Sequence, residues 1–192
     1  FADSLPVQNM YNHYRIVARN SAGVDLYSQP MRILMPEYIP KIRQAFLGSP
    51  LQIPGTVEAE DFDLGGEGFT YHDTDPANLA GDYRPDEGVD IYSRLGEGYH
   101  IGNALPGEWF EYSLKVEKKD NYQIDFQLAA IQGGGTFQVK IGDAVSGIIT
   151  SPNSGSWLTT SRVTDTLNLP AGEQIMRFTV IQQPIFNIDR FV

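Results

Sequence analysis

The chain has 192 residues and a formal net charge of −10 at pH 7, and 41% of its residues are hydrophobic. This length is enough for one large or two small globular domains with a buried core. The negative charge argues against nucleic acid and an anionic membrane surface as partners, because both require a positive field. The chain has no cysteine, which excludes disulfides and thiolate metal sites, so any bound metal should be a hard cation with oxygen ligands.

The first 35 residues predict a short N-terminal β-hairpin. Two alternating runs, 14–19 and 24–28, flank an Asn-Ser-Ala-Gly turn, and Met31–Leu34 is expected to extend the second arm. The Tyr, Val, Ala and Asn of the first run, followed by Ser and Gly, resemble the last two strands of a type III fibronectin domain. We therefore expect residues 1–35 to be the C-terminal strands of a fibronectin-like module.

Prolines at 36, 40, 50 and 54 predict a stiff linker over residues 36–54. Beyond it, short strand signals recur between glycine- and proline-rich turns, which predicts an all-β fold: an antiparallel β-sandwich of the jelly-roll type over residues 55–192. Residues 63–87 form a long irregular stretch, which should be functional or held down by other groups. The expected strands are 56–62, 88–92, 98–102, 108–116, 121–130, 135–142, 145–150, 157–169, 173–181 and 185–192.

Glu58 and Glu60 lie in the alternating run 57–62, so in a strand their side chains would share one face. Two adjacent carboxylates repel, and a cation, an arginine or exposure to water must compensate them. Near the C-terminus Asp189 lies in a second alternating run. If the first and last strands pair, Asp189 completes a hard-cation site with the two glutamates; the alternatives are an exposed aspartate or a salt bridge to Arg190 or another arginine.

The two tryptophans have different contexts. Trp157 follows a loop containing Pro152, Asn153 and Gly155, where it either stands at the rim of a cleft or begins a strand and packs inward. Trp109 begins an apolar-rich strand and is expected in the core. The sequence contains no nucleophile elbow, zinc-binding helix or phosphate-binding glycine loop. Acidic residues are numerous, so a glycosidase pair of carboxylates stays open.

An ordered set of motifs runs through residues 53–192. The motifs are Ile-Pro-Gly-x-Val-Glu-Ala-Glu-Asp-Phe (53–62), Tyr-His-Asp-Thr (71–74), Tyr-Arg (83–84), Gly-Val-Asp-Ile (88–91), His-Ile-Gly (100–102), Gly-Glu-Trp-Phe-Glu-Tyr (107–112), Ser-Gly-Ser-Trp (154–157), Leu-Pro-Ala-Gly (169–172) and Phe-Asn-Ile-Asp-Arg-Phe (186–191). Together they resemble family 6 carbohydrate-binding modules. The resemblance implies a β-sandwich with a structural calcium ion (Ca2+) and a sugar cleft in the loops at one end. The family's calcium ligands fall on Glu58, Glu60 and Asp189, its stacking tryptophan on Trp157 and its hydrogen-bonding asparagine on Asn187.

One position departs from the family pattern. Family members usually carry a second aromatic residue after the Ile/Val-Gly pair, where this chain has Asn103. The cleft is therefore expected to use Phe69, Tyr71 or Tyr99 as its second aromatic, or to bind differently. A carboxylate that contacts sugar in the family corresponds to Glu67.

The resemblance implies a non-catalytic carbohydrate-binding module of a larger glycoside hydrolase that acts on plant or algal polysaccharide. We expect a monomer that is exported by a bacterium, at an extracellular, cell-surface or periplasmic location. Its partners would be a polysaccharide or oligosaccharide and a tethered catalytic domain outside this chain. The alternatives are a structural or adhesion sandwich that has lost the sugar site, and a catalytic sandwich domain that uses acidic residues of the 60–90 region.

Overall fold

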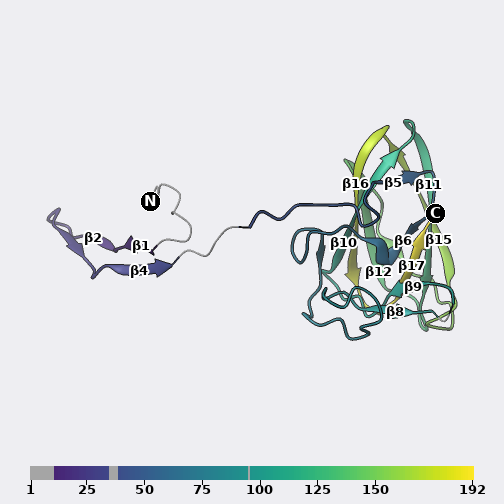
Figure 1. Ribbon diagram of the computed structural model, residues 1–192, viewed down its shortest axis with the longest axis horizontal. Coiled ribbons are helices and arrows are strands. Elements are labelled where there is room, and N and C mark those ends of the chain that lie inside the picture. The colour runs from purple at the N-terminus through teal and green to yellow at the C-terminus, as the bar shows by residue number, and fades with distance from the viewer. Residues whose placement is uncertain (1–10, 35–38, 95) are drawn as a thin grey trace. The chain divides into compact units, whose positions relative to one another are not determined.

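The computed structural model describes residues 11–34, 39–94 and 96–192 (Figure 1). The chain divides into two compact units, Phe1–Pro40 and Lys41–Val192. Residues 1–10 and 35–38, which belong to the predicted fibronectin-like segment and linker, lie outside the described residues. Within the described residues, no helix has the length and apolar character needed to cross a membrane.

The first unit contains the predicted hairpin. β2 and β3 pair antiparallel, and the Asn20 side chain closes their turn by accepting the N–H groups of Ala22 and Val24, each at 3.0 Å. The expectation that Met31–Leu34 extends the second arm is confirmed: this strand pairs antiparallel with β1, which precedes β2 in the first arm, and Met31 lies opposite Tyr14. Pro30, which lacks an N–H, lies at the break between β3 and β4. The strands are β1 (Tyr11–Tyr14), β2 (Val17–Arg19), β3 (Asp25–Tyr27) and β4 (Met31–Leu34).

The second unit is a β-sandwich of a seven-stranded and a six-stranded sheet, counted over the described residues, which confirms the predicted all-β fold class. In the seven-stranded sheet β10 lies between β16 and β5, and in the six-stranded sheet β17 lies between β11 and β9. The first sheet contains β5 (Leu51–Ile53), β7 (Tyr71–His72), β10 (Trp109–Val116), β12 (Thr136–Ile141), β13 (Ala144–Val145), β14 (Ile149–Thr150) and β16 (Gly172–Gln182). The second contains β6 (Val57–Glu58), β8 (Ile91–Ser93), β9 (Tyr99–Ile101), β11 (Asp120–Ala129), β15 (Ser161–Leu169) and β17 (Asn187–Phe191).

The core lies between the two sheets and is rich in phenylalanine. Phe126 of β11 is fully buried, and its ring meets Phe137 of β12 edge-on, with the ring centroids 5.1 Å apart. On β10 the even-numbered side chains from Phe110 to Val116 are buried, as the period of two predicts for a half-buried strand. These inward positions hold the sheets together, so the outward positions are free to build sites.

Trp109 differs from its prediction. It is only partly buried and lies on the outer side of β10, because the inward position belongs to Phe110. The guanidinium of Arg177 lies 3.8 Å from the ring centroid of Trp109. Its apolar surface is therefore covered by a cation rather than by the core.

The two ends of the sandwich meet, because β6 pairs antiparallel with β17, with Glu58 opposite Arg190. The pairing of first and last strands on which the cation hypothesis depends is thus present. The expected continuous strand 56–62 is not: β6 ends at Glu58, and a 3₁₀ helix, η1, covers Ala59–Asp61. Glu58 and Glu60 therefore do not stand on one strand face, and Glu60 is buried while Glu58 is partly exposed.

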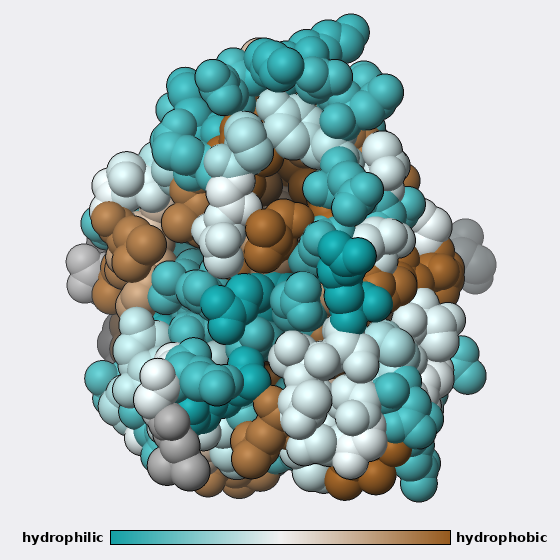
Figure 2. All heavy atoms as spheres, turned by 90° about the vertical axis from the view of Figure 1, so that its right-hand side faces the viewer, coloured by the Kyte–Doolittle hydropathy of each residue, from teal (hydrophilic) through white to brown (hydrophobic). Residues whose placement is uncertain are grey.

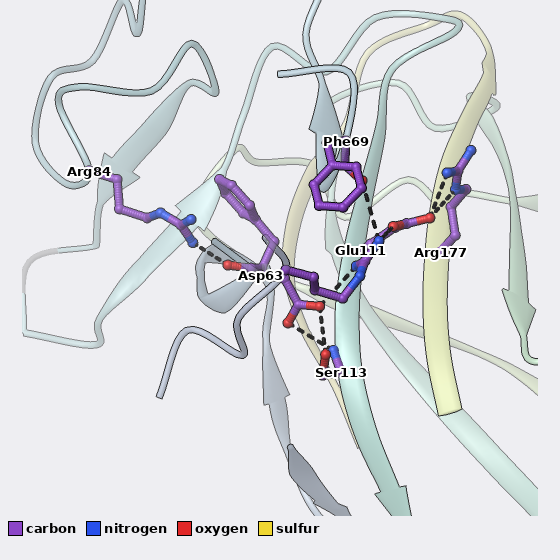
Figure 3. A network of polar contacts seen from close by, with 8 residues as sticks. Asp63, Phe69, Arg84, Glu111, Ser113 and Arg177 are labelled. Atoms are coloured by element: carbon purple, nitrogen blue, oxygen red, sulfur yellow. Dashed lines mark hydrogen bonds and ion pairs between the residues drawn. The ribbon is translucent and has the colours of Figure 1, made fainter. Parts of the chain in front are cut away.

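Much of the predicted linker belongs to the sandwich. β5 pairs in parallel with β10, and Arg43 donates to the buried carboxylates of Asp63 (3.0 Å) and Glu111. Figure 3 shows Asp63 beside Ser113, which donates to it from both its backbone N–H (2.9 Å) and its hydroxyl (2.7 Å). The residues from Lys41 onward thus belong to the second unit, attached to the sandwich through Arg43 and β5.

Arg84 is one of the residues that hold the irregular stretch 63–87 in place. Its side chain is 5% exposed and donates to the carbonyls of Glu60 (2.8 Å) and Phe62 (2.6 Å), and its guanidinium lies 3.5 Å from the centroid of the Phe62 ring. Figure 3 shows Arg84 reaching this backbone from the loop. The stretch is therefore ordered by a buried cation that satisfies backbone carbonyls next to η1.

Candidate functional site

A cavity of about 390 Å³ lies where β8, β9 and β17 meet the loop that precedes β15. Three outward side chains of the six-stranded sheet, those of Tyr92, His100 and Asn187, form part of the cavity wall. Their neighbours Ile91, Ile101 and Ile188 take the inward positions of the same strands. The lining residues are Tyr92, Ser93, His100, Asn103, Trp157, Leu158, Ile185 and Asn187. Of the residues predicted from the sequence for sugar binding, Trp157, Asn187 and Asn103 come together here.

Trp157 stands at the rim of this cavity rather than in the core. It lies in the loop before β15 and is 37% exposed, so part of its ring can be covered by a ligand. Its backbone carbonyl accepts a hydrogen bond from Asn187 Nδ2 at 2.9 Å, which ties the loop to the last strand. An exposed indole on an anchored loop suits stacking against the C–H face of a sugar ring.

Asn187 has a fixed amide orientation. Because the Trp157 carbonyl only accepts, the group facing it must be the NH2 group, which also lies 3.0 Å from His100 Nε2. Burial and the nearby charge of Arg94 lower the pKa of His100, so its ring is neutral at pH 7, with Nε2 accepting and Nδ1 protonated. The amide oxygen of Asn187 is then the group that can accept a sugar hydroxyl.

Tyr92 is a second aromatic side chain of the cavity that the sequence did not indicate. It lies opposite His100 in the β8–β9 pair, and their rings stack with centroids 5.8 Å apart and planes 18° from parallel. Asn103 Nδ2 donates to the Tyr92 hydroxyl at 2.6 Å and to Asp90 Oδ2 at 3.1 Å. The hydroxyl of Tyr92 thereby accepts one hydrogen bond and keeps its own proton for donation to a ligand.

Asn103 occupies the position where the family pattern carries an aromatic residue, and its backbone has a φ of 52°. Asparagine tolerates this left-handed conformation better than most residues. Its side chain does not offer a stacking face but orients Tyr92 through the hydrogen bond above. In this chain the second aromatic face therefore comes from Tyr92 of β8.

Gly102 allows Tyr92 to lie close to the backbone. A Cβ atom at Gly102 would lie 2.9 Å from two carbons of the Tyr92 ring and 3.2 Å from Asn187 Oδ1. We expect Gly102→Ala to displace both side chains, weaken sugar binding about tenfold and cost roughly 1–3 kcal/mol of stability. Calorimetric titration and thermal unfolding measure the two effects. Gly147→Ala is the matched control, because a Cβ there meets nothing within 4 Å; equal effects of the two substitutions would contradict this role of Gly102.

The remaining predicted sugar-binding residues lie elsewhere in the second unit, and the lining of the cavity does not include them. Tyr71 is buried against Phe62, with ring centroids 5.2 Å apart. Tyr99 stacks on Tyr83, and Phe69 lies beneath the Arg43 guanidinium. Glu67 has a half-exposed side chain that pairs with His72 Nδ1 at 2.6 Å.

A smaller cavity of about 230 Å³ shares Asn103 and Ile185 with the first and is lined by four acidic residues. Burial, followed by the charges of Glu108, Asp90 and Asp75, raises the pKa of Asp73 from 3.8 to about 7. The backbone N–H of Asp75 donates to Asp73 Oδ1 at 2.8 Å, a hydrogen bond that an asparagine would keep.

The raised pKa of Asp73 gives a pH-dependent stability. The folded state favours the protonated acid, so the contribution is full below pH 4 and is lost as the pH rises through about 7. We expect Asp73→Asn to unfold near the wild-type temperature at pH 4 and at a higher temperature than the wild type at pH 8. Because Asp73 is partly screened by solvent, the gain in the free energy of unfolding at pH 8 should be about 1 kcal/mol, which corresponds to roughly 2–4 °C. Thermal unfolding at both pH values tests this, and an equal difference at both would contradict it.

Two of the three predicted calcium ligands, Asp189 and Glu58, contact arginine side chains. Asp189 is 3% exposed, and guanidinium groups contact both of its oxygens: Arg94 Nη1 at Oδ1 and Arg190 Nε at Oδ2, the latter at 3.0 Å. Glu58 pairs with Arg190 at 3.5 Å. Burial raises the pKa of Glu60 to about 7, and its buried Oε2 has no hydrogen-bond partner among the described residues.

Calcium requires six to eight oxygen ligands and is repelled by adjacent guanidinium groups. Among the described residues, no group of three or more His, Asp or Glu side chains could hold a metal ion. The arrangement at Asp189 thus does not fit calcium. It matches the alternative raised from the sequence, a salt bridge to Arg190 or another arginine.

Figure 2 shows the face of the second unit that lies to the right in Figure 1. Among the described residues visible there, hydrophobic groups form small separate areas between hydrophilic ones. The described part of this face therefore presents no extended apolar patch. Fold and site together define a β-sandwich binding module.

The sequence model for the carbohydrate binding module (family 6) matches residues 79–192, which is more than half of the chain. The chain therefore belongs to this family, whose members are non-catalytic binding modules. A search of curated proteins finds no significant match.

Solved structures share the fold. The C-terminal family 6 module of a marine laminarinase from Zobellia galactanivorans is 22% identical, with a TM-score of 0.56 over 71% of this chain and 95% of that chain. A family 6 module from Clostridium stercorarium, in complex with cellobiose, is 22% identical, with a TM-score of 0.57 over 76% and 96%. An exo-β-1,3-galactanase from Phanerochaete chrysosporium is 16% identical, with a TM-score of 0.51 over 75% of this chain and 29% of that chain.

Proposed function

We propose that this module binds a polysaccharide in the cavity lined by Tyr92, Trp157 and Asn187. The observation that carries the proposal is the fixed amide of Asn187, which holds the Trp157 loop with its NH2 group and leaves its oxygen as an acceptor. Trp157 offers a stacking face, and the Tyr92 hydroxyl offers a donor. A pyranose ring needs these three elements: an apolar plate, a hydroxyl acceptor and a hydroxyl donor.

We propose a neutral β-glucan as the first ligand class to test. The net charge of −10 and the acidic cavity beside Asn103 disfavour polyanionic sugars. Two structures with this fold support the choice, one a module of a laminarinase and the other a complex with cellobiose.

We further propose that the module is one part of an exported, monomeric glycoside hydrolase with a catalytic domain outside this chain. The laminarinase module and the galactanase, of which the match covers 29%, support this context. The resemblance of residues 11–35 to fibronectin strands is consistent with a chain of several domains. Tethering would raise the concentration of substrate near the catalytic domain without a contribution to the chemistry.

Affinity electrophoresis in gels that contain laminarin, mixed-linkage β-glucan or carboxymethylcellulose tests the proposal. We expect retention in at least one neutral glucan and none in the anionic gel. Retention should be lost in Asn187→Ala, whereas Gly147→Ala should migrate as the wild type does. Normal migration of the wild type in every gel, with no heat of binding to oligosaccharides, would favour a structural spacer instead.

A further inference from the structure

Arg94 connects the last strand to the loop that carries Trp157. Its side chain is 9% exposed and lies just after β8. Nη1 contacts Asp189 Oδ1, and Nη2 donates to the backbone carbonyl of Leu158 at 2.6 Å. The contacts therefore join β17, through one guanidinium group, to the residue that directly follows Trp157.

The Trp157 loop is held at two successive carbonyls. Asn187 donates to the carbonyl of Trp157, and Arg94 donates to that of Leu158. Both donors depend on β17, because Asn187 belongs to it and Arg94 is anchored there by Asp189. The backbone that carries the indole is thus held by two hydrogen bonds, both supported by β17.

Asp189 takes part in this arrangement through a local irregularity of β17. The register with β11 shifts between Gln127 and Leu128, so Asp189 is the extra residue of a β-bulge. A bulge of this kind turns two consecutive side chains toward one side. Asp189 and Arg190 consequently lie together, and their contact at 3.0 Å completes the engagement of the carboxylate.

We propose that Asp189 and Arg94 form a latch that positions Trp157 for sugar binding, and that Arg94 takes the place of the cation that the family resemblance predicts. A carboxylate with both oxygens bound to guanidinium groups needs no metal for charge compensation. Arg94 adds what a spherical ion lacks, a second donor directed at the Leu158 carbonyl. Arg94 is a positioning residue, and its part in affinity rests on the proposed function.

The latch can be tested without a sugar ligand, through the fluorescence of Trp157. In a Trp109→Phe background the fluorescence reports Trp157 alone, since the chain has two tryptophans. We expect Arg94→Met to raise acrylamide quenching and lower the anisotropy of Trp157. Arg162→Met is the matched control, because the Arg162 side chain is 60% exposed and pairs with Asp125 on β11. Unchanged quenching and anisotropy in a folded Arg94→Met protein would overturn the latch.

Arg94→Lys keeps the proposal testable if Arg94→Met does not fold. Lysine keeps the charge beside Asp189 but lacks the planar guanidinium that directs a separate nitrogen at each of the two partners. We expect a melting temperature close to that of the wild type together with increased quenching of Trp157. Quenching equal to that of the wild type would show that the second contact, to Leu158, does not position the indole.

Calcium titration and sugar titration complete the test. We expect the wild type to show no heat of binding with CaCl2 and the same melting temperature with and without chelator. A rise in melting temperature on addition of calcium would overturn the proposal that Arg94 replaces the cation.

With a β-glucan oligosaccharide we expect Arg94→Met to bind about tenfold more weakly than Arg162→Met. Equal affinities of the two variants would count against the latch. If the wild type binds no sugar, the proposed function fails while the quenching result still decides the latch.

Discussion

Trp157→Ala is expected to abolish retention of the module by polysaccharide while the fold persists. The indole is 37% exposed in the loop before β15, so its removal takes little from the core. It removes the stacking surface of the cavity, and truncation of an aromatic anchor of a binding site costs about 2 kcal/mol or more. The loss of affinity should therefore be at least about 30-fold in calorimetric titration.

The other tryptophan provides the control. Trp109 lies on the outer side of the seven-stranded sheet under Arg177, away from the lining of the cavity. Trp109→Phe should bind sugar as the wild type does. If Trp157→Ala retains full affinity, or if Trp109→Phe loses it, the cavity has been assigned to the wrong face of the sandwich.

Asp63→Ala is expected to cause the largest loss of stability, about 3–5 kcal/mol, because it leaves buried partners without their acceptor. Asp63 is 1% exposed and accepts from Arg43 and from both the N–H and the hydroxyl of Ser113. The substitution would also release the described segment around Arg43 from the sandwich. Urea unfolding measures the change in the free energy of unfolding.

Glu173→Ala is the matched control for this loss of a carboxylate. The Glu173 side chain is 73% exposed and lies 3.8 Å from Lys115, so its removal should change stability by less than about 0.5 kcal/mol. A cost below about 1 kcal/mol for Asp63→Ala would mean that the network in Figure 3 does not anchor the segment.

The strands of the sandwich could be predicted because alternation and turn residues agree along the sequence. β10 shows this most clearly, with Phe110 and Tyr112 buried on one side. The local turn at Glu60 could not be predicted, since η1 depends on tertiary contacts such as the hydrogen bonds from Arg84 to carbonyls of this segment. Alternation alone also placed Trp109 in the core, because it does not say which of two adjacent aromatic residues faces inward.

The candidate site was predictable only in part. Trp157 and Asn187 could be identified from their motifs, whereas Tyr92 and His100 required the register of β8 with β9. The glycines of the turn between these strands indicate a hairpin, and the inward Ile91 would then have placed Tyr92 on the outer face. The contact of Arg94 with Asp189 could not be predicted, because it joins residues 95 positions apart.

The most direct measurement is a two-dimensional NMR titration of the ¹⁵N-labelled module with the β-glucan oligosaccharide that electrophoresis selects. The two tryptophans give two indole N–H signals, assigned through Trp109→Phe. We expect the Trp157 signal to shift in a saturable way and the Trp109 signal to stay in place. A saturable shift of Trp109 with Trp157 unmoved would contradict the assignment of the binding site to the cavity of Tyr92, Trp157 and Asn187.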